Sequence, residues 1–155
     1  MAKFKQGEYH LIHPEKYIGK TPVFYKSGLE QRVFSYLDLN NNVLEFSYEP
    51  FAIPYFKPIM NDNKIHMEER KYWIDFYAKI KSKNSDEVKK YLIEVKSKSE
   101  TLPPVAPKKV TFKNRQRLIS EQMTFAVNSA KWRTASTWAK QHDMEFIHLT
   151  SDMIN

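Results

Sequence analysis

The chain has 155 residues, of which 41% are apolar and 14% aromatic, and its net charge is +7. This composition favours a globular domain over a disordered tail, and the length suits one domain, residues 1–155, with a buried core. The lack of cysteine excludes disulfide and thiolate-metal sites, and no apolar run approaches the roughly 18 residues that a membrane span needs. The first residues are too polar for a signal peptide, so we expect a protein that is not secreted and does not contact a membrane.

The first half of the chain predicts one helix among extended or irregular segments. Residues 1–22 contain two prolines and are expected to form an N-terminal arm. Residues 27–38 carry apolar side chains at helical spacing, and Ser27 is a plausible N-cap. Residues 43–56 are expected to be extended, with prolines that favour an edge or bent strand, and residues 57–71 to form a polar loop.

Two strands joined by a hairpin are predicted next. Residues 72–80 and 89–97 are rich in aromatic and β-branched side chains, which favour strands. The polar residues 81–88 between them are typical of a hairpin tip.

The remainder predicts a connection, helical structure and a last strand. Residues 98–114 hold three prolines and four lysines and are expected to form an extended basic connection. Residues 115–142 support one long helix or two, and residues 145–150 a final strand. The order of these elements predicts an α/β fold, in which helices flank a central mixed β-sheet.

The positive charge is concentrated in one stretch. Residues 96–133 contain nine basic and two acidic residues, so this stretch alone accounts for the net charge of +7. A basic stripe of this kind suits a polyanion such as DNA, although an ordinary solvated surface is the alternative. The candidate residues that would contact DNA phosphates are Lys98, Lys108, Lys109, Lys113, Arg115, Arg117 and Lys131.

Asp75, Glu94 and Lys96 form the most specific pattern for a chemical function. Side chains alternate along a strand, so a turn centred near residues 85–86 would put Asp75 opposite Lys96 and Glu94 opposite Tyr77. Both carboxylates would then share a face as diagonal neighbours. Two hard oxygen ligands favour Mg²⁺ or Mn²⁺, and a lysine beside them can hold an attacking water or a phosphate. The competing interpretation is a cross-strand salt bridge between Asp75 and Lys96 on a solvated face.

Glu30 is a candidate third carboxylate from the first predicted helix. Ser27 and Glu30 also have the spacing of a capping box, in which the glutamate satisfies the helix N-terminus. The sequence leaves both interpretations open.

The pattern of Asp75 followed by Glu94-Val95-Lys96 resembles the PD-(D/E)xK nuclease superfamily, with Ile74 where a proline is usual. Over residues 16–152 the chain is similar to head completion proteins of contractile-tailed phages, which resemble TnsA-type transposon endonucleases. This similarity is carried by the segments KYIGKTPVFYKSGLEQRVFSYLD, YEPFAIPY, YWIDFYAKI, KYLIEVKSKSETLPP and MTFAVNSAKWRTASTWAKQHDMEFIHLT.

The resemblance implies a restriction-endonuclease-like core and a metal-dependent DNA endonuclease needed for head completion. It implies Glu30, Asp75, Glu94 and Lys96 as the catalytic set. Asp75 and Glu94 would bind Mg²⁺ or Mn²⁺ with the backbone carbonyl of Val95, and Glu30 is a possible further ligand. Lys131 falls in a late helix that flanks the active-site sheet in this superfamily, where it would approach the phosphate backbone.

The expected partners are double-stranded DNA and phage portal, neck or other head completion proteins. The expected location is the host cytoplasm during assembly and the head or neck of the virion. No nucleotide cofactor is expected, because three glycines leave no phosphate-cradling loop. The alternative is a structural head or neck protein that binds DNA or the portal and cuts nothing. A junction-resolving or repair nuclease of the same superfamily would share the chemistry and differ in substrate.

Overall fold

The computed structural model describes residues 5–154, which form a four-stranded sheet between two helices, with two smaller strand pairs attached. The helices are α1 (Gly28–Leu39) and α2 (Phe112–Gln141), and the short 3₁₀ helices are η1 (Pro14–Lys16), η2 (Lys98–Thr101) and η3 (Ser151–Met153). The strands are β1 (Gly7–Tyr9), β2 (Val23–Tyr25), β3 (Val43–Tyr48), β4 (Ala52–Asn61), β5 (Lys64–Trp73), β6 (Phe76–Lys81), β7 (Val88–Val95) and β8 (Glu145–Leu149).

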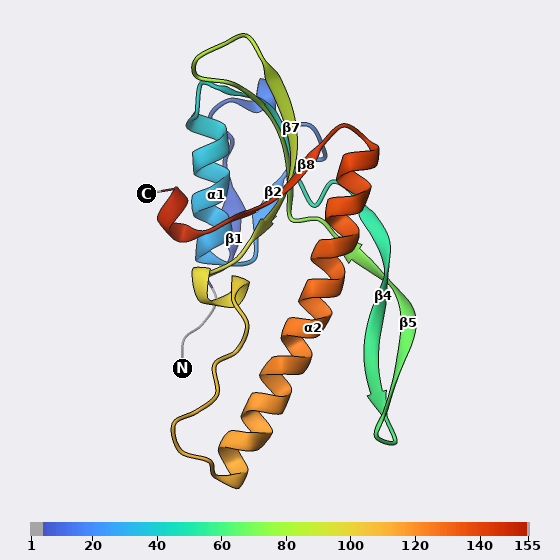
Figure 1. Cartoon of the computed structure of the whole chain (residues 1–155). Coiled ribbons are helices and arrows are strands. Elements are labelled where there is room, and N and C mark those ends of the chain that lie inside the picture. Colours follow the sequence, from blue (N-terminus) through green and yellow to red (C-terminus); the bar gives the residue numbers. More distant parts are fainter. Residues whose placement is uncertain (1–4, 155) are drawn as a thin grey trace.

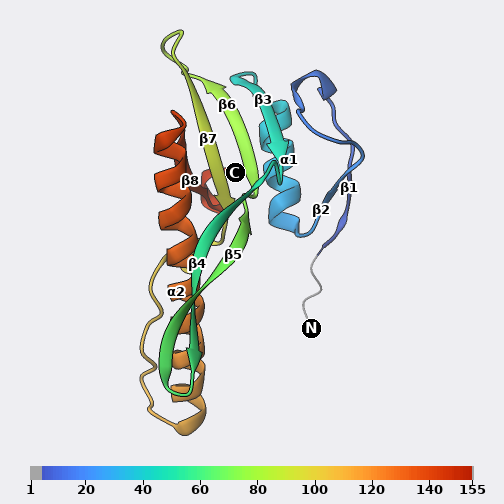
Figure 2. The same cartoon turned by 90° about the vertical axis from the view of Figure 1, so that its right-hand side faces the viewer.

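The central sheet is mixed and has the strand order β3-β6-β7-β8. Strands β3, β6 and β7 pair antiparallel, and β8 pairs parallel to β7 after the chain has crossed over through α2. A parallel pair requires a long crossover of this kind. Figure 2 displays α2, the sheet, α1 and the β1–β2 ribbon as successive layers. The predicted α/β fold with a mixed sheet between helices is therefore confirmed.

Two apolar clusters hold the layers together on opposite faces of the sheet. On one face Phe34 of α1 packs against Phe76 of β6, with ring centroids 4.9 Å apart, and Ile93 of β7 belongs to the same cluster. On the other face Leu92 of β7 and Ala135 of α2 belong to a cluster that also takes in the base of the β4–β5 hairpin. Successive residues of β7 thus point to opposite sides, as strand geometry requires.

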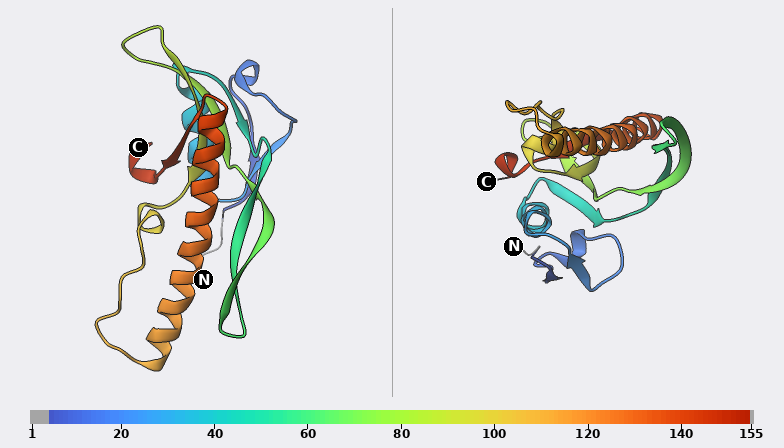
Figure 3. Two further views of the ribbon diagram at one scale, coloured as in Figure 1. Left: turned by 45° about the vertical axis from the view of Figure 1, so that its right-hand side comes forward. Right: turned by 90° about the horizontal axis from the view of Figure 1, so that it is seen from below.

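The β4–β5 hairpin leaves the sheet and runs beside the first half of α2, as Figures 1 and 3 show. The prediction of a polar loop at residues 57–71 is wrong, because these residues complete two ten-residue strands. Asp62 and Asn63 have φ angles of 50° and 61°, the left-handed conformation that a tight two-residue hairpin turn requires. Charged residues conceal the strand pattern, since much of the hairpin is exposed on both faces.

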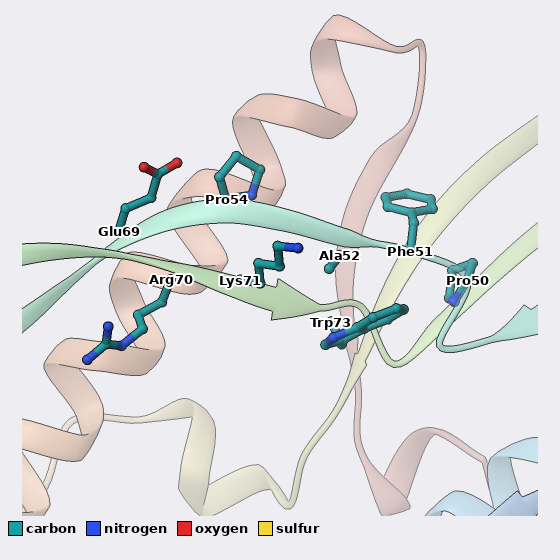
Figure 4. A pocket seen from close by; sticks show the side chains of 8 residues that line it. All are labelled: Pro50, Phe51, Ala52, Pro54, Glu69, Arg70, Lys71 and Trp73. Carbon is teal, nitrogen blue, oxygen red and sulfur yellow. The ribbon is translucent and has the colours of Figure 1, made fainter.

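The outer face of the hairpin is apolar and exposed. Directly paired positions share a face, and on this face Trp73, Phe56, Met67, Met60 and Ile65 are each more than half exposed. A cavity of about 870 Å³ lies at the base of the hairpin, where Trp73, Lys71 and Pro54 are among the residues that line it (Figure 4).

Most of the other predicted elements are confirmed, with two corrections. Ser27 caps α1 by accepting a hydrogen bond from the Glu30 amide, and residues 115–142 lie almost entirely in one helix. Residues 72–80 are not one strand, because the chain leaves β5 at Trp73 and enters β6 at Phe76. Residues 1–22 are not simply an arm, since β1 and η1 lie within them.

The predicted extended connection at residues 98–114 is confirmed only in its middle, because its first four residues form η2 and its last three belong to α2. Residues 98–114 open with η2 and are then irregular up to the start of α2, and the predicted hairpin tip and final strand are present. In the described residues 5–154, no helix has both the length and the apolar character that crossing a membrane requires.

Asp38 anchors the N-terminal segment on α1. Its buried carboxylate accepts hydrogen bonds from the Tyr9 hydroxyl at 2.9 Å and from the amides of Ile12 at 2.7 Å and His13 at 2.9 Å. These contacts are what the polar pattern of residues 1–22 failed to predict, since they join positions at least 25 residues apart.

Replacing Asp38 by alanine should lower the free energy of unfolding by about 2–4 kcal/mol, because amides left without an acceptor keep their desolvation cost. Urea denaturation of D38A and of the control E15A, which alters an exposed side chain of the same segment, measures this. An equal effect of both substitutions would contradict the anchoring role of Asp38.

Candidate active site

Asp75 and Glu94 are brought together where β6 begins and β7 ends. Phe76 pairs with Ile93 and Tyr77 with Leu92, so one further step along the ladder sets Asp75 opposite Glu94. An oxygen of Asp75 accepts a hydrogen bond of 2.9 Å from the Val95 amide. The end of one strand is thereby tied to the beginning of the other through a carboxylate.

The predicted strand register is wrong by two residues. The turn centres between Asn84 and Ser85, because the Ser82 amide donates to the Glu87 carbonyl and closes the tip earlier than expected. Asp75 is therefore not opposite Lys96. A shift of two residues preserves the face of every side chain, whereas a shift of one would have separated the two acids.

The break between β5 and β6 gives Asp75 its position. The Glu49 amide donates to the Asp75 carbonyl at 2.8 Å, and the Ile74 amide donates to the Phe51 carbonyl at 3.2 Å. These two bonds fix the backbone on both sides of the break. Ile74 joins the α2-facing cluster with Leu92 and Tyr77, so the simple alternation predicted along residues 73–77 does not hold at the break.

Burial and repulsion define the electrostatics of the acid pair. Glu94 is only 5% exposed, and the Tyr72 hydroxyl donates to its carboxylate. Burial and then the negative charge of Glu94 raise the pKa of Asp75 to about 8. Burial, the charge of Glu94 and this hydrogen bond also raise the pKa of Tyr72. The pair therefore favours a positive charge beside it, supplied by a proton or a cation.

Two lysines flank the acid pair from different elements. Lys96 Nζ lies 3.8 Å from a Glu94 oxygen and 3.9 Å from a Glu100 oxygen. Lys131 of α2 lies over two tyrosine rings, 5.7 Å from the centroid of Tyr55 and 5.6 Å from that of Tyr72. Burial lowers the pKa of Lys131, and the charges of Lys96 and Lys57 add to this, while the negative charge of Glu94 opposes it.

Glu30 lies close enough for its charge to help raise the pKa of Asp75, after the effects of burial and Glu94. Its carboxylate accepts hydrogen bonds from the Lys26 amide at 2.7 Å and from the Tyr48 hydroxyl at 3.0 Å. Glu30 therefore acts at the N-terminus of α1, as the capping-box interpretation predicts, but its carboxylate accepts from the Lys26 amide rather than from the Ser27 amide.

Residues 5–154 contain no group of three or more histidine, aspartate or glutamate side chains arranged to hold a metal ion. The donors that the site offers for a metal are the two carboxylates of Asp75 and Glu94 beside the backbone of Val95. Hard oxygen atoms that repel one another in a buried place match the ligand preference of Mg²⁺ or Mn²⁺.

The remaining predicted DNA contacts lie farther away. Lys108 and Lys109 belong to the connection before α2, and Lys113, Arg115 and Arg117 to the first turns of that helix. All five are exposed. Lys98, in η2, is also exposed and is close to Lys96 in the chain. At 1.5 Å per residue, Lys113 lies about 27 Å along α2 from Lys131.

Several residues near the acids escaped the sequence analysis. Lys26 donates to Glu49 at 2.7 Å, Tyr48 and Tyr72 hold Glu30 and Glu94, and His148 pairs with Glu94 in the parallel register. No local motif marks them, because each approaches the site through tertiary packing. His148 could have been predicted as the neighbour of Glu94 only by recognising that β7, α2 and β8 form one strand–helix–strand crossover with parallel strands.

The buried acid pair has a consequence for stability. In the folded chain Asp75 holds a proton up to a pH of about 8, but in the unfolded chain it loses that proton near pH 4. The free energy of unfolding should therefore fall as pH rises through this window.

Asp75→Asn cannot ionise and keeps an oxygen for the Val95 amide, so without metal it should be more stable than wild type at pH 8.5 by at least about 1 kcal/mol. Urea denaturation in chelator at pH 5.5 and 8.5 measures this, and a wild-type stability that rises with pH beside a flat D75N would contradict it.

Comparison with known proteins supplies independent information about the chain. Residues 40–151 match the family model described as TnsA-like endonuclease N terminal. The head completion nuclease of Enterobacteria phage T4 is 32% identical over 130 residues, which cover 84% of this chain and 79% of that protein. No solved structure matches. The family match includes Asp75, Glu94, Lys96 and Lys131, and Glu30 lies outside it.

Proposed function

The chain belongs to the TnsA-like endonuclease family, and from this premise we propose that it is a divalent-metal-dependent deoxyribonuclease that acts in the completion of a phage head. The observation that carries the proposal is the pair of the half-buried Asp75 and the buried Glu94, with Lys96 beside it. Hydrolysis of phosphodiester bonds needs an activated water and stabilisation of negative charge on phosphorus, and these side chains are suited to both tasks.

Asp75, Glu94 and the Val95 carbonyl would hold Mg²⁺ or Mn²⁺. A bound divalent ion supplies a water of lowered pKa and neutralises charge on the phosphate. The raised pKa of Asp75 supports this assignment, because two buried carboxylates without a cation retain a proton. Glu30 would join the ligands only by giving up its bonds to Lys26 and Tyr48.

The other side chains would orient the reacting groups. Tyr72 restrains the carboxylate of Glu94 through its hydrogen bond. Lys96 would hold the attacking water or a phosphate oxygen beside Glu94. Lys131, restrained over the rings of Tyr55 and Tyr72, would contact the phosphate from the α2 side. The exposed basic residues from Lys98 to Arg117 would bind the DNA backbone with the steep salt dependence of phosphate contacts.

A role in head completion rests on the phage T4 relative, whose name is head completion nuclease. We accordingly propose DNA as the substrate, a portal, neck or other head completion protein as partner, and the infected host's cytoplasm or the virion as location. One observation favours the alternative of a structural head component, the exposed apolar face of the β4–β5 hairpin, since such faces are used to bind proteins. Cleavage by the purified protein separates the two.

Wild-type protein should nick supercoiled plasmid in Mg²⁺ or Mn²⁺ but not in chelator. D75A and K96A should each lower the nicking rate at least about 100-fold, the usual contribution of one positioned catalytic group. Agarose-gel time courses measure this, with D86A and K83A at the exposed β6–β7 tip as matched controls. Equal cleavage by all variants, or none by folded wild type, would favour the structural role.

Metal binding can be tested apart from catalysis. Mn²⁺ at about 100 times its dissociation constant should stabilise the folded protein by about 2.7 kcal/mol, because only the folded state assembles the ligands. Thermal denaturation should show a rise in Tm for wild type and for the control E145Q, whose side chain pairs with Lys89 at the surface. E94Q should lose most of this rise, and an equal rise in all three proteins would place the ion elsewhere.

A further inference from the structure

The β4–β5 hairpin and α2 enclose a groove that leads to the acid pair. The helix–hairpin groove has a volume of about 590 Å³ and is lined by Lys57, Ser120, Met123, Thr124, Asn128 and Lys131, with the three residues that follow Lys57 and with Val127. Lys131, at its upper end, also lies over Tyr72, which holds Glu94. The groove and the candidate active site therefore share a wall.

The charges of the helix–hairpin groove favour an anionic ligand. Its charged lining residues are Lys57 and Lys131, and no acidic side chain lines it. Among residues 5–154 neither lysine has an ion pair within 4 Å, and each repels the other. A phosphate between them would relieve this repulsion.

The floor of the groove is polar without being charged. Ser120, Thr124 and Asn128 recur every four residues, so they lie on one face of α2 that continues to Lys131. This stripe is about 16 Å long at 1.5 Å per residue. Hydroxyl and amide groups can bind sugars and phosphates without preference for sequence, and Met123 adds an apolar surface for stacked bases.

The width of the groove selects a single strand. The hairpin and α2 are in direct contact above the groove, where Tyr55 and Ala135 belong to one buried cluster. Figures 1 and 3 show that the two elements draw apart below this contact, toward the hairpin tip. Spread along the stripe of about 16 Å, the groove volume of about 590 Å³ gives a mean cross-section of roughly 37 Å², which is roughly 6 Å across. Duplex DNA, whose major groove alone is about 12 Å wide, exceeds that space.

The adjoining flank of α2 sets a boundary for this path. A second cavity, of about 420 Å³, shares Ser120, Thr124 and Asn128 but is also lined by Glu100 and Glu121. These carboxylates repel phosphate, which leaves the hairpin side as the route for a DNA backbone.

We propose that the helix–hairpin groove binds a single DNA strand and guides it to Asp75 and Glu94, so that the substrate class is duplex DNA with an unpaired strand or end. This inference rests on the proposed nuclease function and specifies its substrate. It differs from general basic attraction, because the groove discriminates between DNA structures and the exposed lysines do not.

The test compares binding of three fluorescent DNAs in chelator: a blunt duplex, the same duplex with a single-stranded tail, and the tail alone. Fluorescence anisotropy should give about tenfold tighter binding to the tailed duplex than to the blunt one, which corresponds to one stacked base. N128D, which adds a negative charge to the groove, and K57M should each abolish this preference. K57M should also reduce the salt slope of tail binding by about 0.7.

Q122E is the matched control for N128D. It adds the same charge to an exposed position of α2 outside the groove, so it should retain the tail preference. Since Lys57 and Asn128 lie on different elements, loss of the preference in both variants with unchanged Tm excludes misfolding as the cause.

The outcomes separate this inference from the proposed function. Wild type that nicks plasmid but shows no tail preference, or a preference that survives both N128D and K57M, overturns the groove inference and leaves the nuclease intact. Wild type that binds tails in the expected pattern but never cuts DNA supports the groove as a strand-binding site and overturns the nuclease.

Discussion

The hydrogen bond between the Asp75 carboxylate and the Val95 amide joins the two strand ends on which the site depends. It connects the last residue of the β5–β6 break with the last residue of β7. The half-buried Asp75 carboxylate held in this way also lies close to Glu94, and the repulsion between the two acids is the electrostatic cost of their closeness. The rest of the architecture offsets that cost. Tyr72 donates to Glu94, and Lys96 and Lys131 supply positive charge from two other directions.

The break between β5 and β6 is as important as the acids themselves. If residues 72–80 formed one straight strand, Tyr72 would continue along the sheet and could not turn its hydroxyl toward Glu94. The bonds from the Glu49 amide to Asp75 and from the Ile74 amide to Phe51 hold the bend. The bend therefore gives the sheet and the hairpin different roles. The sheet positions the two acids, and the hairpin supplies the tyrosines that restrain Glu94 and Lys131.

The sequence predicted what depends on local periodicity and missed what depends on tertiary contact. The α1 cap at Ser27, the helical structure of residues 115–142 and the faces of Asp75 and Glu94 follow from spacing, and spacing survives a register error of two. That these residues form one helix rather than two was left open. The hairpin at residues 57–71 was missed because its exposed strands lack a buried face, although Asp62 and Asn63 carry the turn. Tyr72, Lys26 and His148 could not be assigned, since their partners lie more than 20 residues away in the chain.

The β4–β5 hairpin is inserted between two neighbouring strands of the sheet, because the chain leaves at the end of β3 and returns at the start of β6. Its tip can therefore be lengthened or trimmed without moving the strand ends that carry the acids. Such changes conserve the pattern of inner and outer side chains only when one residue is added to or removed from each strand together. Related chains should accordingly vary in the reach of this arm by matched pairs of residues, while the sheet and its turn into β6 stay constant. Insertion length would then adapt one catalytic core to different surroundings.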